Sequence, residues 1–324
     1  MLMRRRLAAV AAAGIITARA APAGAQPAWP TRPVRLLVGS TPGGSADIGA
    51  RIVSARLAAR IGQPVVVENK PGATGLIAAA EVARAAPDGH TLLFTASWHS
   101  TAAAMRTALP FDPLGDFSFL STLVTYGMML AVRPSSPYAR LEDLLAAARA
   151  RPGTLSYYSV GIGSGHHLIG EWLLGATGVE MVHVPYRGSA AALPDFMAGR
   201  VDLMIDTMTI AFEMARKETI RPLAITSTAP MPELPGVRLA SEIVPGFSYE
   251  SWLGLMGPGG MPGSLMHRLS EEIRLIVAMP DVDARLREMG AVPAASTPEA
   301  FHARVAGEIA SFNRVVETRR LPRE

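Results

Sequence analysis

Short apolar runs alternate with longer stretches in which apolar residues recur every three or four positions. The short runs are typical of buried strands, and the periodic stretches are typical of amphipathic helices. The predicted strands are 34–38, 65–68, 92–95, 128–132, 155–159, 181–184, 203–206, 221–226 and 252–256. The predicted helices are 46–61, 77–85, 141–151, 166–176, 190–198, 263–278, 280–289 and 298–316, with Ser264 and Thr297 as capping signals. This order predicts an α/β protein with mainly parallel sheets.

A glycine-rich turn lies between the first predicted strand and the first predicted helix. Its sequence is Gly39-Ser-Thr-Pro-Gly-Gly-Ser45, and helical spacing begins at Ile48. Backbone N–H groups at a helix start have no partner within the helix, and the helix dipole is positive there. Gly43 and Gly44 would let a ligand approach this backbone closely. The turn therefore fits a carboxylate or phosphate, but many α/β proteins use the same turn for chain geometry alone.

A second turn of the same kind occurs much later in the chain. The segment Tyr157-Tyr-Ser-Val-Gly-Ile-Gly-Ser-Gly-His-His-Leu-Ile-Gly-Glu171 runs from a strand end through a Gly/Ser turn into a helix start. Neither turn contains Lys or Arg, which phosphate sites usually recruit. Two such turns, each in its own domain, favour a small, singly charged carboxylate bound in one cleft.

The second turn does not match the usual catalytic and cofactor patterns. Ser164 lies between two glycines, but a Gly-x-Ser-x-Gly nucleophile motif needs glycine at the positions of Ile162 and His166. Gly161-x-Gly163 lacks the last glycine of a dinucleotide fingerprint. We therefore expect no catalytic residue and no cofactor.

Two histidines begin the predicted helix 166–176. His167 and Glu171 are spaced to share a helix face, but no third metal ligand lies nearby, so a structural hydrogen bond is favoured over a metal pair. His166 at a helix N-terminus should favour its neutral form. It then either donates to a ligand oxygen or faces solvent. No metal site is expected.

The N-terminal segment has the features of an export signal. Residues 4–6 are arginines, residues 7–16 are apolar but too few to span a bilayer, and Ala23-Gly-Ala25 fits a cleavage site. We predict a signal peptide over residues 1–25 and a periplasmic mature chain that starts near Gln26. An uncleaved N-terminal anchor is the alternative.

Removal of this segment changes the charge of the chain. The whole sequence has 31 Lys and Arg against 27 Asp and Glu. Residues 1–25 contain four arginines and no acid, so the mature chain carries 27 residues of each sign. A neutral chain without a basic patch does not indicate nucleic-acid binding. The lack of cysteine excludes disulfides, thiolate metal sites and a cysteine nucleophile.

Motifs spread over the mature chain point to one family. They are Trp29-Pro-x-Arg-Pro33; Pro42-Gly-Gly-Ser-x-Asp47 with Arg51; Gly62-Gln-Pro-Val-Val-Val-Glu-Asn69 with Pro71-Gly-Ala73; Ala85-Ala-Pro-Asp-Gly89; Leu109-Pro-Phe-Asp-Pro113 with Asp116-Phe117; Ser164 to His167 with Glu171; His183-Val-Pro-Tyr-Arg-Gly188; Asp206; and Ser251-Trp-x-Gly254 with Gly257-Pro-x-Gly-x-Pro262. With these motifs the sequence resembles the Bug family, the periplasmic solute-binding proteins of tripartite tricarboxylate transporters.

The resemblance implies a two-lobed Venus-flytrap fold of the type II periplasmic binding proteins, each lobe a mainly parallel sheet flanked by helices. The chain would cross between the lobes near residues 125–134 and 245–258. Lobe 1 would then hold residues 29–130 and 252–324, and lobe 2 residues 131–251. Closure of the lobes around a ligand would be a hinge motion.

The resemblance also implies a ligand carboxylate gripped between two glycine-rich loops by backbone N–H groups, hydroxyls and waters. The first jaw would be Pro42, Gly43, Gly44, Ser45 and Asp47, with Ser40 beside it; the second jaw would be Gly163, Ser164, Gly165 and His166; and Ser97, Tyr186 and Asp206 would line the distal part. Each of the polar residues has a structural alternative. Asp47 could stabilise its own helical turn, Ser97 and Asp206 could be caps, and Tyr186 could be packing.

Several positions depart from the family pattern. Ser40 is small where the family commonly has an aromatic residue, Ile162 replaces a common Asn, and Gly165-His166 replaces Ser-Ser; Trp98-His99 is also atypical. Because backbone groups would supply the carboxylate grip, the resemblance implies that the grip survives. The specificity pocket is expected to be reshaped, so no relative's ligand is transferred.

We therefore predict a monomeric, non-enzymatic binding protein that delivers a small organic carboxylate to permease subunits of a tripartite tricarboxylate transporter. One alternative is a sensor subunit that passes a closed-lobe signal to a kinase. Another is a secreted serine hydrolase using Ser164 with His166 or His167, which the motif context disfavours.

Overall fold

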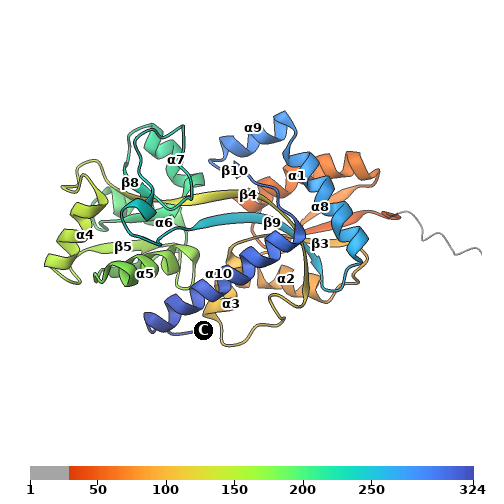
Figure 1. Ribbon diagram of the computed structural model, residues 1–324, viewed down its shortest axis with the longest axis horizontal. Helices are drawn as coiled ribbons and strands as arrows, with labels where there is room; N and C mark the ends of the chain where they lie inside the picture. Colours follow the sequence, from red (N-terminus) through yellow and green to blue (C-terminus); the bar gives the residue numbers. More distant parts are fainter. Residues whose placement is uncertain (1–28) are drawn as a thin grey trace, which may run out of the picture.

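The computed structural model describes residues 29–324 as an elongated α/β molecule in which two groups of strands and helices are joined by β4 and β9 (Figure 1). The strands are β1 (Val34–Val38), β2 (Val65–Asn69), β3 (Thr91–Ala96), β4 (Phe117–Val132), β5 (Ser156–Ser159), β6 (Val182–Pro185), β7 (Met204–Thr207), β8 (Arg221–Ile225), β9 (Glu250–Pro258) and β10 (Val292–Pro293). The helices are α1 (Ser45–Ile61), α2 (Leu76–Ala83), α3 (Trp98–Met105), α4 (Leu141–Ala150), α5 (Gly165–Thr177), α6 (Ser189–Met197), α7 (Met208–Arg216), α8 (Gly263–Val277), α9 (Pro280–Glu288) and α10 (Pro298–Thr318). The predicted signal peptide lies outside the described residues.

Parallel strands form one end of the larger sheet. β1 pairs in parallel with β2 and β3, and Val38 lies opposite Phe94. Four of the five β1 residues are buried, because helices cover both faces of a parallel sheet and favour continuous apolar runs. The carboxyl ends of parallel neighbours share one edge, so the loop after β1 emerges beside Ser97 at the end of β3.

Two long antiparallel strands join the two ends of the molecule. β4 has 16 residues, all buried, and pairs with β9 over Phe117–Gly127 and with β7 and β8 over its last residues. β9 also pairs with β3. The α/β prediction is confirmed, but these two strands make the sheet mixed rather than mainly parallel. β5 and β6 keep a parallel pair of their own.

The C-terminal helix α10 packs against both groups. Phe301 and Val305 join the apolar cluster around β3 and β4, whereas Phe312 and Val316 join the cluster around α4 and α5. Figure 1 shows α10 running along the molecule past α3 and α5. The hydroxyl of Thr297 accepts from the N–H of Ala300, which confirms the predicted cap of this helix.

Some predicted elements differ from the structure. The sequence patterns missed α3, α7, β10 and residues 117–127 of β4. Ser264 does not cap α8, because the helix begins one residue earlier, with Pro262 at the N-cap position and no side-chain cap. Within residues 29–324, no helix combines the length and apolar character needed to cross a membrane.

Candidate functional site

Asp47 holds the first glycine-rich loop in place. Its carboxylate is buried and accepts from the N–H of Gly43 at 2.9 Å, from Nδ2 of Asn69 at 2.9 Å and from Nε of Arg51 at 3.1 Å. Asn69 Nδ2 also donates to the carbonyl of Ser40. The hydrogen bond from Arg51 is the largest effect on the pKa of Asp47; burial opposes it, and the bonds from Gly43 and Asn69 help to lower the pKa to about 2. Asp47 is therefore an ionised loop anchor.

The N-terminus of α1 offers donors that the loop itself does not. Gly44 is the N-cap residue and has an extended backbone, and no side chain caps the helix. The N–H groups of Ser45 and Ala46 belong to the first helical turn and have no acceptor among residues 29–324. The N–H of Gly43 is already used by Asp47. The N–H of Gly44 donates to the carbonyl of Thr41, so the available donors lie two and three residues later than Gly43, at Ser45 and Ala46.

The second loop also uses side chains to order its own turn. The hydroxyl of Ser164 accepts from the N–H of His167 at 3.3 Å and donates to the carbonyl of Gly161 at 2.6 Å. The N–H of Gly163 donates to Nδ1 of His167 at 3.2 Å. Ser164 is therefore the N-cap of α5, and the N–H groups of Gly165 and His166 remain directed out of the helix start.

His166 is tied to the buried carboxylate of Asp206. Its Nε2 lies 3.1 Å from Oδ1 of Asp206, which also accepts from the N–H of Thr207; Oδ2 accepts from the hydroxyl of Tyr158 at 2.8 Å. Burial alone would raise the pKa of Asp206, but the bonds from His166 and Tyr158 outweigh it and lower that pKa. The His166 ring does not face open solvent, because it is held against the buried carboxylate of Asp206.

A cavity of about 200 Å³ lies between these elements. Its wall includes residues of the β3–α3 junction, of β4, of the second loop and of β9. The lining residues are Ala96, Ser97, Trp98, Thr101, Tyr126, Met128, Val160, Ser164, Gly165, His166, Thr207, Tyr249 and Ser251. Among the predicted site residues, Ser97, Ser164, Gly165 and His166 meet here.

Three helices begin at this cavity. Their N-cap residues Ser97, Ser164 and Thr207 all line it, and they start α3, α5 and α7. None of the described residues that line the cavity carries a carboxylate, an ammonium or a guanidinium group. The positive ends of three helix dipoles therefore contribute a positive electrostatic potential in the cavity, and this potential favours a bound anion.

Other predicted residues do not line this cavity. Ser40 and the segment Pro42–Ser45 do not line it, although the loop leaves the sheet at the same edge as Ser97. The hydroxyl of Tyr186 donates to Oδ2 of Asp195 at 2.8 Å, outside the lining. Gly163 packs near Met105 of α3.

The candidate metal pair has structural partners instead. Glu171 accepts from the hydroxyl of Tyr157 at 2.7 Å and from Nε of Arg319 at 2.8 Å. The ring of His167 stacks on His183 with centroids 4.1 Å apart. Burial lowers the pKa of both rings, to about 4 in His183. Over the described part of the chain, no three His, Asp or Glu side chains are placed to hold a metal ion.

Comparison with known proteins places the chain in a family. A family model described as the tripartite tricarboxylate transporter family receptor matches residues 49–321. The chain belongs to this receptor family. It is 32% identical to the protein BugT of Bordetella pertussis over 310 residues, which cover 95% of this chain and 94% of BugT. The resemblance to the Bug proteins is therefore confirmed.

Solved structures of similar receptors share the fold. The chain resembles Rpa4515 of R. palustris, solved with adipate, at 34% identity and a TM-score of 0.79, covering 91% of this chain and all of that one (100%). It resembles MatC of Rhodopseudomonas palustris, solved with bound malate, at 30% identity and a TM-score of 0.74, covering 89% and 100%. The expected two-lobed binding-protein fold is confirmed by these likenesses.

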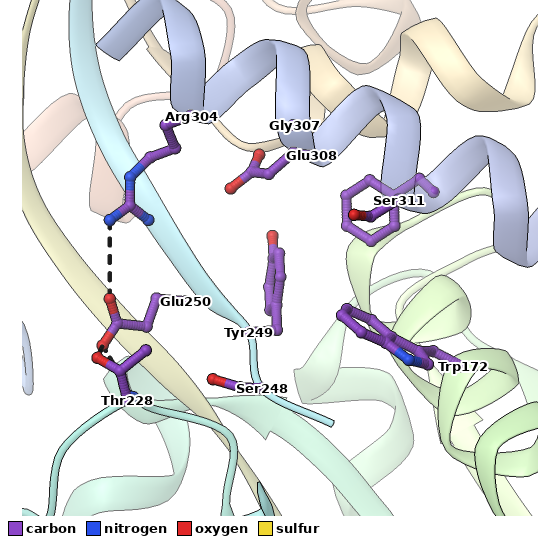
Figure 2. Close-up of a pocket in the computed structure, with 10 residues that line it drawn as sticks. Trp172, Thr228, Ser248, Tyr249, Glu250, Arg304, Gly307, Glu308 and Ser311 are labelled. Carbon is purple, nitrogen blue, oxygen red and sulfur yellow. Dashed lines mark hydrogen bonds and ion pairs between the residues drawn. The ribbon is translucent and has the colours of Figure 1, made fainter. Parts of the chain in front are cut away.

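This receptor also has a second cavity, of about 320 Å³, where α5, α10 and the start of β9 meet (Figure 2). Figure 2 shows the hydroxyl of Tyr249 directed toward Glu308, and Tyr249 lines the first cavity as well. Burial raises the pKa of Glu308 to about 7, although Nε1 of Trp252 donates to its carboxylate at 2.8 Å. Arg304 lies 3.8 Å from Glu250 at the rim.

The sequence patterns missed most of the cavity wall. Tyr126 and Met128 lie on β4, and Tyr249 directly precedes β9; no local motif marks these three residues. Ser251 on β9 fell within a quoted motif but was not predicted as a site residue. Trp98 and Thr101 lie in α3, which was not predicted. Two signals pointed to this part of the wall: the predicted site residue Ser97 and the departure Trp98-His99 from the family pattern.

Proposed function

We propose that this protein is a periplasmic solute-binding protein that captures a small organic carboxylate in the cavity of about 200 Å³ and delivers it, as a monomer, to the membrane subunits of a tripartite tricarboxylate-type transporter. The observation that carries the proposal is the meeting of three helix N-termini at a cavity whose described lining has no charged Lys, Arg, Asp or Glu side chain. The adipate and malate found with two similar receptors support a carboxylate.

We further propose that residues 29–130 with 252–324, and residues 131–251, are the two lobes. β4 and β9 are the long strands that lie near both proposed crossings. In this arrangement the first turn of α1 would meet the ligand when the lobes close, and Gly165 and His166 would meet it from the other side. The ligand is bound and released unchanged, because Ser164 serves as a helix cap instead of facing a general base.

The experiment is a thermal-shift screen of carboxylic acids, followed by calorimetric titration of the hits. Gly165→Pro is the decisive variant: it removes one N–H that the helix does not use, and proline is tolerated at the first helical position. The extended Ser164 before it also suits proline. Gly165→Ala keeps the N–H, and its side chain meets open space.

We expect Gly165→Ala to bind like wild type and Gly165→Pro to bind about tenfold or more weakly, since a hydrogen bond to a charged group is worth about 1.5–3 kcal/mol. Equal affinities in the two variants would place the carboxylate away from α5. Failure of every carboxylate to bind would refute the proposed function.

A further inference from the structure

We infer that the ligand is a carboxylate with one charged group and an apolar body, and that Trp98 sets this preference. The inference rests on the proposed function, because it concerns the same cavity. Two features of the cavity wall support it: the fixed position of Trp98 and the lack of cationic side chains in the described lining.

Trp98 is held in a fixed position at the cavity. It is the first residue of α3 and is half-buried. A Cβ on Gly75, whose φ is +89°, would lie 2.6 Å from Cζ2 of the indole, so the ring rests directly against this backbone. A Cβ on Gly39 would in turn lie 2.6 Å from Cα of Gly75. The indole is thus braced, through Gly75, against the start of the first glycine-rich loop.

The neighbouring residue on α3 is equally ordered. The His99 ring is buried, forms an edge contact with the indole at 5.9 Å between centroids, and its Nε2 is 2.8 Å from the carbonyl of Pro113. A wall that is fixed before the ligand arrives costs little ordering on binding. Trp98 therefore offers a rigid apolar face to the ligand.

Most of the polar side chains around the cavity are already bonded within the protein. The exception is the buried hydroxyl of Tyr249, which is directed toward Glu308 and not bonded to it (Figure 2). The hydroxyls of Ser97 and Ser251 are 2.6 Å apart, and the hydroxyl of Thr101 donates to the carbonyl of Trp98. His166 is bonded to Asp206. Trp98, Tyr126, Met128 and Val160 contribute the apolar surfaces of the remaining wall.

A ligand with two or three carboxylates fits this wall poorly. Burying an additional carboxylate is costly unless a cation or several donors face it. The described lining contains no ammonium or guanidinium, and its free donors are backbone N–H groups at helix starts and the single hydroxyl of Tyr249. A single carboxylate can use these N–H groups while an aromatic, cycloaliphatic or alkyl body lies against Trp98 and Met128.

The test compares two sets of probes by calorimetric titration of the full mature protein. The apolar set is benzoate, cyclohexanecarboxylate and hexanoate; the polar set is malate, succinate, adipate and citrate. We expect the best apolar acid to bind about tenfold or more tightly than every member of the polar set. Trp98→Ala should remove most of this preference, and Trp98→Phe should retain most of it, because an aromatic face is kept.

Tryptophan fluorescence gives an independent readout. Trp172→Phe is the matched control, because Trp172 lines the second cavity and not the first. Binding of an apolar acid should change the emission of wild type and Trp172→Phe, and the change should be lost in Trp98→Phe while calorimetry still detects binding. This comparison remains decisive if Trp98→Ala does not fold.

The inference is overturned if polar acids bind as tightly as apolar ones, or if Trp98→Ala weakens both sets equally. In those cases a carboxylate still binds, so the proposed function stands. If no acid of either set binds, both the function and the inference fail.

Discussion

The N–H of Gly43 donates to Oδ2 of Asp47 at 2.9 Å, so the first loop is closed by a carboxylate of its own helix. The loop would otherwise present this N–H to a ligand, as the sequence led us to expect. The loop is instead shaped in advance by an internal anion, and the ligand is left with the donors of Ser45 and Ala46. A jaw held in this way needs little rearrangement to bind.

Asp47→Asn should loosen the first loop. The free energy of unfolding should fall by about 1.5–3 kcal/mol, the range for hydrogen bonds to a charged group, and ligand affinity should fall with it. The half-buried Asp283→Asn, whose carboxylate pairs with Arg287 of its own helix rather than with the first loop, is the control. Urea unfolding and calorimetry measure the two effects. An unchanged affinity in a destabilised Asp47→Asn would show that the first loop does not take part in binding.

The same substitution has a pH signature. Because the pKa of Asp47 is lowered in the folded state from 3.8 to about 2, its contribution is present above pH 3.8 and is lost as pH falls through about 2. The stability difference between wild type and Asp47→Asn should therefore be constant from pH 7 to pH 5 and shrink in more acid solution. A difference that grew on acidification would contradict the ionised anchor.

Gly43 and Gly44 should respond differently to valine. Gly43 has a φ of +84°, which strains any branched residue, so Gly43→Val should lower stability by about 1–3 kcal/mol. Gly44 has a φ of −74°, and a Cβ there would meet its nearest atom, the carbonyl oxygen of Thr41, at 3.5 Å. Of the two glycines, only Gly43 therefore has a backbone conformation that a branched side chain would strain. Gly44→Val should melt nearly like wild type.

Ligand affinity separates the first jaw from nearby cations. Gly44→Val should bind about tenfold or more weakly, because its side chain covers the approach to α1. Arg187 is exposed, and Arg187→Ala should leave affinity unchanged. Arg51→Ala should weaken binding to an intermediate degree, because it removes the bond that Arg51 donates to Asp47. Normal affinity in Gly44→Val, with binding lost in Arg187→Ala, would show that the ligand carboxylate does not bind at the first jaw.

Removal of the His166 side chain should destabilise the protein, because the buried carboxylate of Asp206 then loses its bond to Nε2 of His166. His166→Ala leaves a buried carboxylate with fewer donors, so the free energy of unfolding should fall by about 1–3 kcal/mol. Asp206→Asn added to this variant should recover part of the loss, because it removes the charge that lacks its partner. A double-mutant cycle by urea unfolding measures the coupling. Strictly additive losses would mean that the two side chains are energetically independent.

Glu308 should make stability depend on pH near neutrality. Burial raises its pKa in the folded protein from 4.5 to about 7. Its stabilising contribution is therefore full below pH 4.5 and is lost as pH rises through about 7. The wild type should lose about 3 kcal/mol from this group between pH 4.5 and pH 8, and Glu308→Gln should not. Urea unfolding across that range, with the exposed Glu317→Gln as control, tests this. Parallel profiles for wild type and Glu308→Gln would contradict it.

Local sequence patterns were sufficient for some elements and not for others. The strand 34–38 was predicted with its exact bounds, because a parallel strand buried on both faces is a continuous apolar run. Residues 117–127 of β4 were missed because Ser118, Ser121 and Thr122 interrupt the apolar residues there. These hydroxyls are buried beside a distant segment: Ser121 donates to the carbonyl of Ser296 at 2.9 Å. That partner lies 175 residues away, beyond any local pattern.

The candidate site shows the same division. Ser164, Gly165 and His166 could be located because a glycine turn before a helix is a local signal. Tyr126 and Tyr249 reach the cavity only because β4 and β9 pair across the molecule. Asn69 was noticed within a motif, but its bonds to Ser40 and Asp47 depend on the pairing of β1 with β2.

The continuity of β4 limits how the gene can be divided. One strand supplies hydrogen-bonding edges to β9 at one end and to β7 and β8 at the other. A fragment that stopped within β4 would deprive one sheet of an interior strand and expose unsatisfied backbone edges that invite aggregation. Separately expressed halves should therefore be insoluble, and a split reporter or circular permutant of this receptor should place its new ends in surface turns such as that at Gly153.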